Sequence, residues 1–370
     1  MTACQKRGGI DLATGIPSTS ADPRAVDGAV AALRAGANVY SDTRGLPELR
    51  RAVAGKLRRE NALDYDAERE VLITSGITGG LAASLLALFK AGDTVLVLEP
   101  FFDWHIRLIV LAGLTPGFVS LRGPDYALTR ASLEAALGPR VRGLVLCTPG
   151  NPSGKVLARD ELETIADFAR EHDLRLVTDE QYESFCFGDA RHLSPAAVGD
   201  LRRRTATVGG FSKSLAVTGW RIGYAAGPAR FIDAIHDVHQ ALYICPPTPL
   251  QHGVLAALTG SSDGPDVHAF ERKRDRLCAA LRDAGFGVCV PQGGFFVLAD
   301  SRTVPALQLP NPALALLEGV GVAAVPGTAF STDPADATVL RFCYAKDDAV
   351  LDEGCRRLRT LASGASPAAR

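Results

Sequence analysis

The sequence predicts an α/β protein, with a doubly wound and mostly parallel sheet in a large domain and a smaller α+β domain after it. Two observations carry this prediction. Through the middle of the chain, short apolar runs alternate with longer amphipathic stretches, which is the pattern of strands and crossover helices. Most of these runs are apolar without interruption, as expected for strands that helices cover on both faces.

The first two elements are predicted to be helices that begin at proline. Asp22 caps a helix that starts at Pro23 and stops at Gly36, and a second helix starts near Pro47. Strands and helices then alternate. The predicted strands are residues 71–75, 94–100, 142–149, 174–180, 205–211 and 221–227, with helices over residues 81–92 and 158–173 between them.

A proline-rich break at residues 246–250 ends this region. A basic helical stretch follows, and then short strands at residues 287–291, 293–300, 321–327 and 338–345. We therefore predict a large domain over residues 41–240 and a small domain over residues 245–370. The N-terminal segment, residues 1–40, is expected to pack with the small domain and to carry no sheet strand of its own.

Composition excludes some classes of partner. The chain has 370 residues, of which 47% are hydrophobic, and a formal net charge of −1; this gives no attraction to nucleic acid or to an anionic membrane. The eight cysteines form no CxxC pair and no Cys/His metal spacing, so we predict no metal and reduced thiols of a cytoplasmic protein. The N-terminus lacks a signal-peptide core, and no apolar run reaches membrane-spanning length.

The segment GGFSKSLAVTGWRIGY, residues 209–224, carries the strongest chemical signal. Lys213 follows an apolar strand, and Arg221 comes eight residues later. A primary amine forms a Schiff base with an aldehyde and a guanidinium binds phosphate, so the pair suits an enzyme that holds pyridoxal phosphate (PLP). The spacing alone is a weak signal, but further functional groups follow the other strands.

Ligands of a doubly wound sheet bind beyond the carboxyl ends of its strands. The glycine-rich residues 76–80 open a helix and suit a phosphate, or they form an ordinary strand–helix turn. Phe102 stacks on a flat ring or packs in the core. Asn151, held extended by the following proline, points its amide into the site or belongs to a turn.

Three further residues complete the series. Asp179 ends a strand, where it pairs with a protonated ring nitrogen or caps a helix, and Tyr182 is a candidate donor to a ring oxygen. Arg341 lies in a late strand, where it binds a substrate carboxylate or forms a partly exposed salt bridge. Each motif is modest alone, but together they occur in a consistent order.

In this order the motifs resemble those of class I and II aminotransferases, which are PLP enzymes of fold type I. The resemblance covers about residues 8 to 356 and is most specific in TPGNPSGKV, VTDEQYESF, GGFSKSLAVTGWRIGY and YSDTRGLPELR. EPFFDWH and LRFCYAKDDAVL are similar to the branch of kynurenine, glutamine and methionine aminotransferases. The resemblance implies a homodimer with shared active sites that moves the α-amino group of an L-amino acid to a 2-oxo acid through a Lys213 Schiff base.

The resemblance also implies a role for each motif residue. The catalytic residues are Lys213, which carries the cofactor and moves a proton, Asp179 at the pyridine nitrogen and Tyr182 at the ring oxygen. Further cofactor contacts are Asn151 at the ring oxygen, Phe102 on the ring, Ile77, Thr78, Ser212 and Arg221 at the phosphate, and Tyr40 at the phosphate of the other subunit's cofactor. The substrate contacts are Arg341 and Asn151 at the carboxylate, with Gly15 and Ile16 closing over the substrate.

Two positions depart from the family pattern. Many relatives carry a phosphate-binding serine where this chain has Gly210, a role left to Ser212 or Thr78, and the kynurenine branch has an asparagine in place of Cys147. These departures leave a second class open, in which the same fold catalyses elimination, cyclisation or oxidation of an amino acid. A PLP-binding transcription regulator is disfavoured, because the family pattern begins within about ten residues and leaves no space for a helix-turn-helix domain.

The substrate side chain is predicted to be aromatic or neutral and polar. The candidate pocket residues Ile16, Phe102, His105 and Tyr243 fix no charge preference. His105 touches the substrate or, at the start of a helix packed on the sheet, has a structural role. No second arginine is assignable to a side-chain carboxylate, so aspartate is not the favoured substrate.

Overall fold

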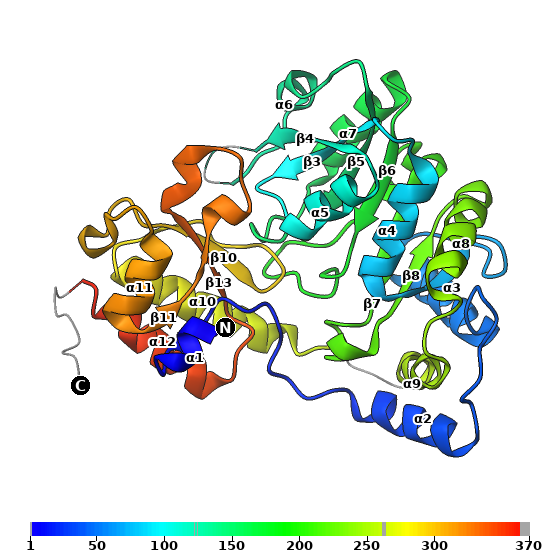
Figure 1. Cartoon of the computed structure of the whole chain (residues 1–370), viewed down its shortest axis with the longest axis horizontal. Helices are drawn as coiled ribbons and strands as arrows, with labels where there is room; N and C mark the ends of the chain where they lie inside the picture. Colours follow the sequence, from blue (N-terminus) through cyan, green and yellow to red (C-terminus); the bar gives the residue numbers. More distant parts are fainter. Residues whose placement is uncertain (1, 122, 124, 261–263, 363–370) are drawn as a thin grey trace.

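The computed structural model describes residues 2–121, 123, 125–260 and 264–362, which form two main sheets (Figure 1). The larger sheet has seven strands in the order β2-β8-β7-β6-β5-β3-β4. Only β8 runs antiparallel to its neighbours among these strands, which confirms the predicted α/β class. The strands are β2 (Val71–Ser75), β3 (Thr94–Glu99), β4 (Thr115–Ser120), β5 (Val141–Cys147), β6 (Arg175–Asp179), β7 (Thr205–Gly210) and β8 (Ile222–Ala226).

Helices cover both faces of the large sheet. One face packs against α4 (Gly76–Leu88), α5 (Asp103–Leu111) and α8 (Ala229–Tyr243), and the other against α6 (Arg130–Ala135), α7 (Arg159–Glu171) and α3 (Pro47–Asn61). Neighbouring residues of one strand therefore bury on opposite sides: Val95 and Val97 of β3 face the first group, and Leu96 faces the second. Burial on both faces explains why the strands read as uninterrupted apolar runs.

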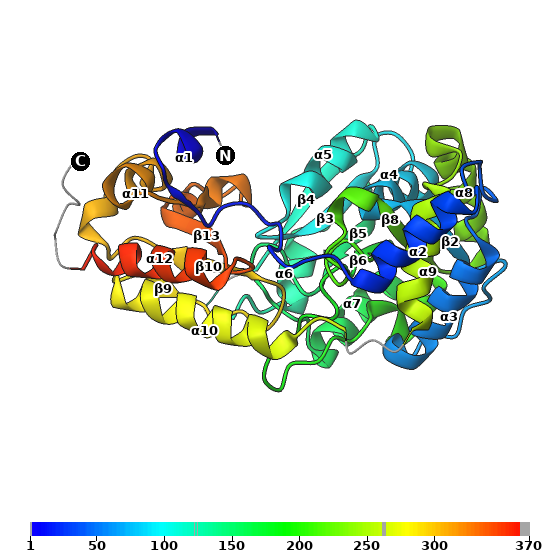
Figure 2. The ribbon, with the colours of Figure 1, turned by 90° about the horizontal axis from the view of Figure 1, so that it is seen from below.

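The smaller sheet has four antiparallel strands in the order β12-β13-β10-β9. Figure 2 shows α10 and α12 side by side along this part of the molecule. Its core is rich in aromatic side chains, among them Phe295, Phe342 and Tyr344. The elements are β9 (Gly287–Val288), β10 (Phe296–Asp300), β12 (Val325–Pro326), β13 (Val339–Cys343), α10 (Val267–Asp283), α11 (Pro312–Val320) and α12 (Asp348–Arg359).

Local sequence signals explain several element boundaries. Asp22 Oδ1 accepts a hydrogen bond from the Arg24 amide at 2.9 Å, so the predicted cap of α2 (Pro23–Arg34) is confirmed. The edge strand β4 was not predicted, because its sequence TPGFVS contains proline and glycine, which weaken a strand signal. Short 3-10 helices occur at Pro195–Ala197, Leu201–Arg203, Thr218–Trp220, Pro305–Leu307, Gly327–Ala329 and Pro334–Thr338.

The N-terminal segment contacts both parts of the molecule. Its first residues, with α1 (Thr2–Lys6), lie beside the small sheet, where β1 (Ile10–Asp11) pairs in parallel with β11 (Val322–Ala323). The expectation that this segment carries no strand was wrong, because two residues are too few to show a period. Helix α2 instead packs on α9 (Thr248–Thr259), which also contacts α3 and β8 of the large layer.

These contacts bear on the predicted division of the chain. Helix α9 belongs to the predicted small domain, residues 245–370, and α2 to the predicted N-terminal segment, residues 1–40. Both helices nevertheless pack with the large sheet. The three-part division itself stays a prediction. Within the described residues, no helix combines the length and the apolar character needed to cross a bilayer.

Glycines allow α2 and α9 to approach closely. A Cβ atom at Gly253 would lie 2.5 Å from the carbonyl oxygen of Ala25, and one at Gly28 would lie 2.6 Å from Cβ of Ala256. Both distances are shorter than van der Waals contact, so any side chain there pushes the helices apart. The attachment of α2 to the large layer thus depends on these two glycines.

We predict that Gly253→Ala lowers the free energy of unfolding by about 1–3 kcal/mol, because the added methyl group overpacks the α2–α9 contact. Gly319→Ala is the matched control: Gly319 lies inside α11 with nothing within 4 Å of the added Cβ, so helix propensity raises stability by up to about 1 kcal/mol. Urea unfolding measures both. Equal effects of the two substitutions would contradict the close-packing account.

Candidate active site

A cavity of about 500 Å³ opens where the carboxyl ends of the large-sheet strands meet the small sheet. The carboxyl ends of five strands lie at the edge of the sheet beside this cavity, because these strands all run in the same direction: β2, β3, β5, β6 and β7. Its lining includes Gly15, Ile77, Thr78, Phe102, Trp104, His105, Asn151, Asp179, Gln181, Tyr182, Ser212, Lys213, Arg221, Phe296, Phe330 and Arg341.

Lys213 follows β7 and points its amine into the cavity. Nζ donates to the carbonyl oxygen of Gly15 at 3.1 Å and lies 5.7 Å from the centre of the Phe295 ring. Burial lowers the pKa of Lys213 most strongly, and the charges of Arg221 and Arg341 add to this, against opposite effects of Cys343 and Asp179. The amine therefore loses its proton more readily than a solvated lysine, as a nucleophile or base requires.

Asp179 ends β6 and is 1% exposed. Its Oδ2 lies 3.0 Å from Nε2 of His105, and Gln181 donates to Oδ1 and Oδ2 at 3.3 Å from its backbone and side-chain nitrogens. Burying a carboxylate is costly unless donors or a cation stabilise it. The carboxylate thus lies ready for a cationic ligand atom, with His105 holding its orientation.

The other end of the cavity suits an anion. Helix α4 begins at Gly76, and a Cβ there would lie 2.6 Å from Nη2 of Arg221, so glycine lets the guanidinium approach the helix N-terminus. Nη2 donates to Thr78 Oγ1 at 3.4 Å, and Nη1 to the Thr218 carbonyl at 3.0 Å. Within the described chain no carboxylate lies within 4.0 Å of Arg221. An exposed guanidinium beside the positive helix end attracts an anionic ligand.

Arg341 projects from β13 into the cavity, and its guanidinium carbon lies 4.3 Å from the Phe296 ring centre and 4.6 Å from that of Phe330. Nη1 donates to Asn151 Oδ1 at 2.9 Å, and Nη2 to the Ala13 carbonyl at 3.0 Å. Nε is buried without a partner among the described residues. Burial lowers the pKa of Arg341. Neutral acceptors alone leave the charge uncompensated, so a carboxylate ligand fits here.

Tyr182 and Phe102 line the space between these charged groups. Tyr182 is 2% exposed, and burial foremost, with Cys147 and Asp179, raises the pKa of its phenol well above the ordinary value. The phenol is therefore a hydrogen-bond donor at neutral pH. The Phe102 ring meets the His105 ring edge-on, with centres 5.5 Å apart, and forms part of the cavity wall.

The family model described as aminotransferase class I and II matches residues 7–358. The chain belongs to this family. It is 37% identical to a probable N-succinyldiaminopimelate aminotransferase of Mycobacterium tuberculosis, over 96% of this chain and 93% of that protein. It is 32% identical to an aspartate aminotransferase of Pyrococcus abyssi, over 95% of this chain and 91% of that protein.

Solved structures agree with the family match. The structure of N-succinyldiaminopimelate aminotransferase from Mycobacterium tuberculosis has a TM-score of 0.91 to this chain at 37% identity, with 98% of this chain and 96% of that chain covered. Class I and II aminotransferases are PLP enzymes of fold type I, so this chain is a PLP-dependent aminotransferase. The alternative of elimination, cyclisation or oxidation is not favoured.

The cavity of the aminotransferase fits this cofactor on its own chemistry. The anion end at α4 and Arg221 suits a phosphate, the buried Asp179 carboxylate suits a protonated ring nitrogen, and Lys213 is an amine suited to an aldehyde. Tyr182 supplies a donor for the ring oxygen. The cavity therefore offers a complementary group for each polar part of PLP.

Most of the residues that the sequence singled out lie together in the aminotransferase. The cavity brings together Gly15, Ile77, Thr78, Phe102, Asn151, Asp179, Tyr182, Ser212, Lys213, Arg221 and Arg341. Ile16, Tyr40 and Tyr243 do not line it, and their exposed fractions are 50%, 74% and 40%. In a single chain these three residues therefore face outward.

Sequence reasoning missed the role of His105 as the partner of Asp179, and it did not select Trp104, Gln181, Phe296 or Phe330. His105 is 4% exposed and lies within hydrogen-bond distance of the Asp179 carboxylate. Of the two alternatives for His105, the structure is nearer to a structural role than to substrate contact, although its partner is a residue of the site. Its place three residues after Phe102, on the first turn of α5, was the available signal. The other four residues carried no motif.

The structure explains the Gly210 departure from the family pattern and shows the surroundings of the Cys147 departure. A Cβ at Gly210 would lie 2.8 Å from Cγ1 of Ile77, so the Ile77 side chain occupies the space that a serine needs, whereas Ser212 and Thr78 both line the cavity. The Cys147 thiol lies 3.6 Å from the Pro149 carbonyl oxygen, and burial first, then Asp179, raises its pKa well above the ordinary value. Cys147 therefore stays a thiol, too weakly acidic to act as a nucleophile.

We predict that an amine-directed reagent modifies Lys213 of the cofactor-free enzyme at half its maximal rate at a pH below 10.5, the ordinary value of a lysine pKa. Asp179→Asn removes a charge that raises this pKa, so the midpoint moves lower still. Mass spectrometry of the peptide over a pH series measures both midpoints, with the urea-unfolded chain as the control. A midpoint at or above 10.5, or one that Asp179→Asn raises, contradicts the account of the site.

Proposed function

We propose that Lys213 holds the cofactor covalently and carries the substrate α-proton during amino-group transfer. Its pKa lies below the ordinary lysine value, so a larger share of the amine is free base able to take a proton. Bound PLP supplies an electron sink for the charge left on the substrate carbon. Lys213 Nζ holds the proton between its removal and its delivery. The observation that carries the proposal is the place of this part-buried amine, which follows β7 and lines the cavity beside Asp179, Tyr182 and Arg341.

The remaining cofactor-binding residues orient the ring and hold its phosphate. Asp179 stabilises the positive ring nitrogen, and Tyr182 and Asn151 donate to the ring oxygen. This proposal rests on the buried carboxylate with its His105 contact and on the protonated phenol. The ring face and the phosphate are assigned to Phe102, Ile77, Thr78, Ser212 and Arg221.

Arg341 is proposed to bind the substrate α-carboxylate together with Asn151. The planar guanidinium lies between two phenyl rings, which fix its orientation, and its buried Nε has no partner among the described residues. Gly15 and Ile16 belong to the N-terminal segment beside Lys213 and are proposed to close over the substrate. Closure there excludes water from the reacting atoms.

For the substrate side chain we propose an aromatic or neutral polar group. The cations that line the cavity within the described chain are Lys213, Arg221 and Arg341, and each is already assigned. No further cation is left for a side-chain carboxylate, while Trp104, Phe296 and Phe330 offer aromatic surface. Methionine, glutamine, phenylalanine and kynurenine have side chains of this kind.

We predict that the purified enzyme converts methionine, glutamine or phenylalanine to the 2-oxo acid, with a 2-oxo acid as acceptor, at a higher kcat/KM than aspartate. The aspartate side chain would place an unpaired carboxylate against an apolar wall, which is costly, whereas an uncharged side chain avoids this cost. Product formation is measured by chromatography for each amino acid in turn. Lys213→Ala is the matched control and forms no product.

Two results would contradict separate parts of this proposal, the role of Lys213 and the substrate class. Turnover by Lys213→Ala at the wild-type rate removes Lys213 from the mechanism whatever the substrate. If Lys213→Ala is inactive but the wild-type enzyme prefers aspartate, the mechanism stands and the proposed substrate class is overturned. That result implies that a cation from outside this chain's own cavity binds the aspartate side chain.

The enzyme is proposed to be a homodimer in which Tyr40 reaches the phosphate of the partner's cofactor. Exposed apolar residues gather near the start of α9: Val39 and Tyr40 are 75% and 74% exposed, and the Val39 carbonyl accepts from Thr248 Oγ1 at 2.7 Å. Leu242 and Ile244, at the end of α8, are 51% and 44% exposed. Apolar surface of this kind is typical of an interface between subunits.

We predict that co-expressing Tyr40→Ala and Lys213→Ala chains restores activity at limiting PLP. A mixed dimer with shared sites has one site that contains both Lys213 and Tyr40, because the two residues come from different chains. Activity is compared with that of each variant alone at equal total protein. Activity no higher than the sum of the separate variants contradicts the shared site.

A cytoplasmic location is also proposed. Cys4, Cys278, Cys343 and Cys355 are free thiols and are buried. Unpaired thiols persist in reducing compartments. Location of a tagged chain in fractionated cells tests this directly.

A further inference from the structure

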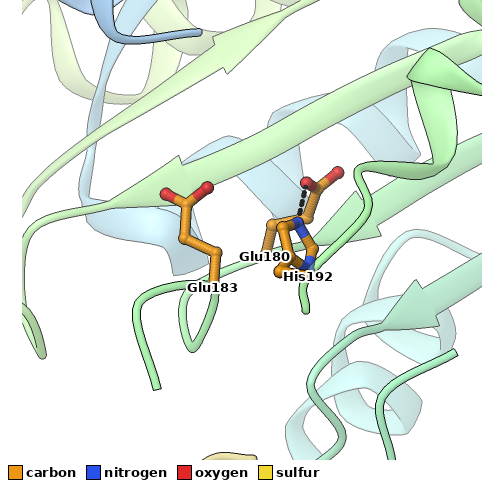
Figure 3. A group of neighbouring side chains, drawn as sticks. All are labelled: Glu180, Glu183 and His192. Carbon is orange, nitrogen blue, oxygen red and sulfur yellow. Dashed lines mark hydrogen bonds and ion pairs between the residues drawn. The ribbon is translucent and has the colours of Figure 1, made fainter. Parts of the chain in front are cut away.

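The end of β6 and the turn after it, residues 179–183, present side chains to two different sides. Asp179 and Tyr182 line the active-site cavity, and Glu180, Glu183 and His192 do not. These three side chains instead lie beside one another (Figure 3). The turn is closed by the Glu183 amide, which donates to the Glu180 carbonyl at 3.1 Å. In the chain, Glu180 directly follows Asp179 and Glu183 directly follows Tyr182, so each glutamate is one peptide bond away from a cavity residue.

Glu180 is fully buried and is held by three donors. Its Oε1 accepts from Thr178 Oγ1 at 2.6 Å and from Ser194 Oγ at 3.0 Å, and its Oε2 lies 2.8 Å from Nε2 of His192. Charge-assisted hydrogen bonds of this kind are about twice as strong as neutral ones. The carboxylate therefore fixes the turn to the segment that carries His192 and Ser194.

Glu183 fixes the other end of the turn to helix α3. It accepts from Lys56 Nζ at 2.5 Å and from Asn61 Nδ2 at 2.7 Å, and Lys56 also donates to Asn61 Oδ1 at 2.8 Å. Burial raises the pKa of Glu183, but Lys56, His192 and Asn61 more than offset this, so its pKa lies below the ordinary value. Glu183 is therefore a charged anchor at neutral pH.

A cation site is the weaker explanation for this cluster. One ligand atom each of Glu180, Glu183 and His192 lies within 4.8 Å of the others, a spacing that a metal ion accepts. Lys56 Nζ, however, already contacts Glu183 and supplies positive charge, and Glu180 has three hydrogen-bond partners. Both carboxylates thus have partners without an ion, as a structural anchor requires, whereas His192 Nδ1 is buried without a partner among the described residues.

We propose that Glu180 and Glu183 are positioning residues. They hold the catalytic turn, residues 179–183, from outside the cavity, so that Asp179 and Tyr182 meet the cofactor in the productive orientation. This inference rests on the roles proposed for Asp179 and Tyr182. The two carboxylates, Glu180 buried and Glu183 part-buried, are three residues apart; Glu183 binds α3, Glu180 binds the 192–194 segment, and together they fix both ends of the turn. A misplacement of about 1 Å at a reacting group lowers a rate by up to about 100-fold.

The test uses the full-length enzyme with Glu180→Gln and Glu183→Gln, each of which keeps the side-chain shape and removes the charge. We expect kcat to fall about 10- to 100-fold with little change in KM for the amino acid. We also expect weaker binding of PLP to the cofactor-free protein, measured by titration, and a shifted pH midpoint of the bound cofactor's absorbance. These last two readouts do not depend on turnover.

Glu161→Gln is the matched control. Glu161 is a buried carboxylate of α7 that pairs with Lys155 at 2.9 Å and accepts from the Leu128 and Ala158 amides, but it has no contact with the catalytic turn. It is expected to lower thermal stability and leave the absorbance midpoint unchanged. If Glu180→Gln does not fold, Ser194→Ala removes one of its three donors and is expected to shift the same readouts by a smaller amount.

The outcomes separate this inference from the proposed function. If Asp179→Asn and Tyr182→Phe impair PLP binding and kcat, while Glu180→Gln and Glu183→Gln only lower stability as Glu161→Gln does, the positioning role is overturned. If Asp179→Asn and Tyr182→Phe themselves change neither PLP affinity nor kcat, the proposed function fails and the inference fails with it. Parallel changes in the four turn variants, absent from Glu161→Gln, support the positioning role.

Discussion

The buried carboxylate of Asp179 is the constraint on which the rest of the site depends. At 1% exposure it is stable only with strong donors or a counter-charge. His105 and Gln181 supply donors from the cavity side, and the same charge partly opposes the effects of burial, Arg221 and Arg341 on the pKa of Lys213. One carboxylate thus links the helix packed on the sheet, the catalytic amine and the place for a cationic ring nitrogen.

The two sheets contribute different chemistry, and the N-terminal segment joins them. The large sheet brings its strand ends to one edge, where they supply the groups suited to a phosphate, a ring and an aldehyde. The small sheet supplies Arg341, which reaches across to Asn151 at 2.9 Å. Ala13 and Gly15 then accept from Arg341 and Lys213. In the proposed binding mode, a substrate between Arg341 and Lys213 contacts groups from the large sheet, the small sheet and the N-terminal segment.

Much of this was predictable from the sequence because local signals specify it. Uninterrupted apolar runs marked the strands of the parallel sheet, and polar residues at or shortly after the strand ends marked the site, as for Asp179 and Lys213. The rest depends on tertiary contacts that no local pattern encodes. The His105–Asp179 contact, the packing of α2 on α9 through Gly28 and Gly253, and the rings of Phe296 and Phe330 around Arg341 each join residues far apart in the chain.

The central claim is that Lys213 is the residue that holds PLP. The most direct measurement is reduction of the holoenzyme with borohydride, which makes the linkage between a lysine and the cofactor permanent, followed by mass spectrometry of the peptides. The account predicts one labelled peptide, with the cofactor-derived mass on Lys213. A label on another lysine, or an unlabelled Lys213 in an enzyme that retains its activity and its cofactor, would contradict it.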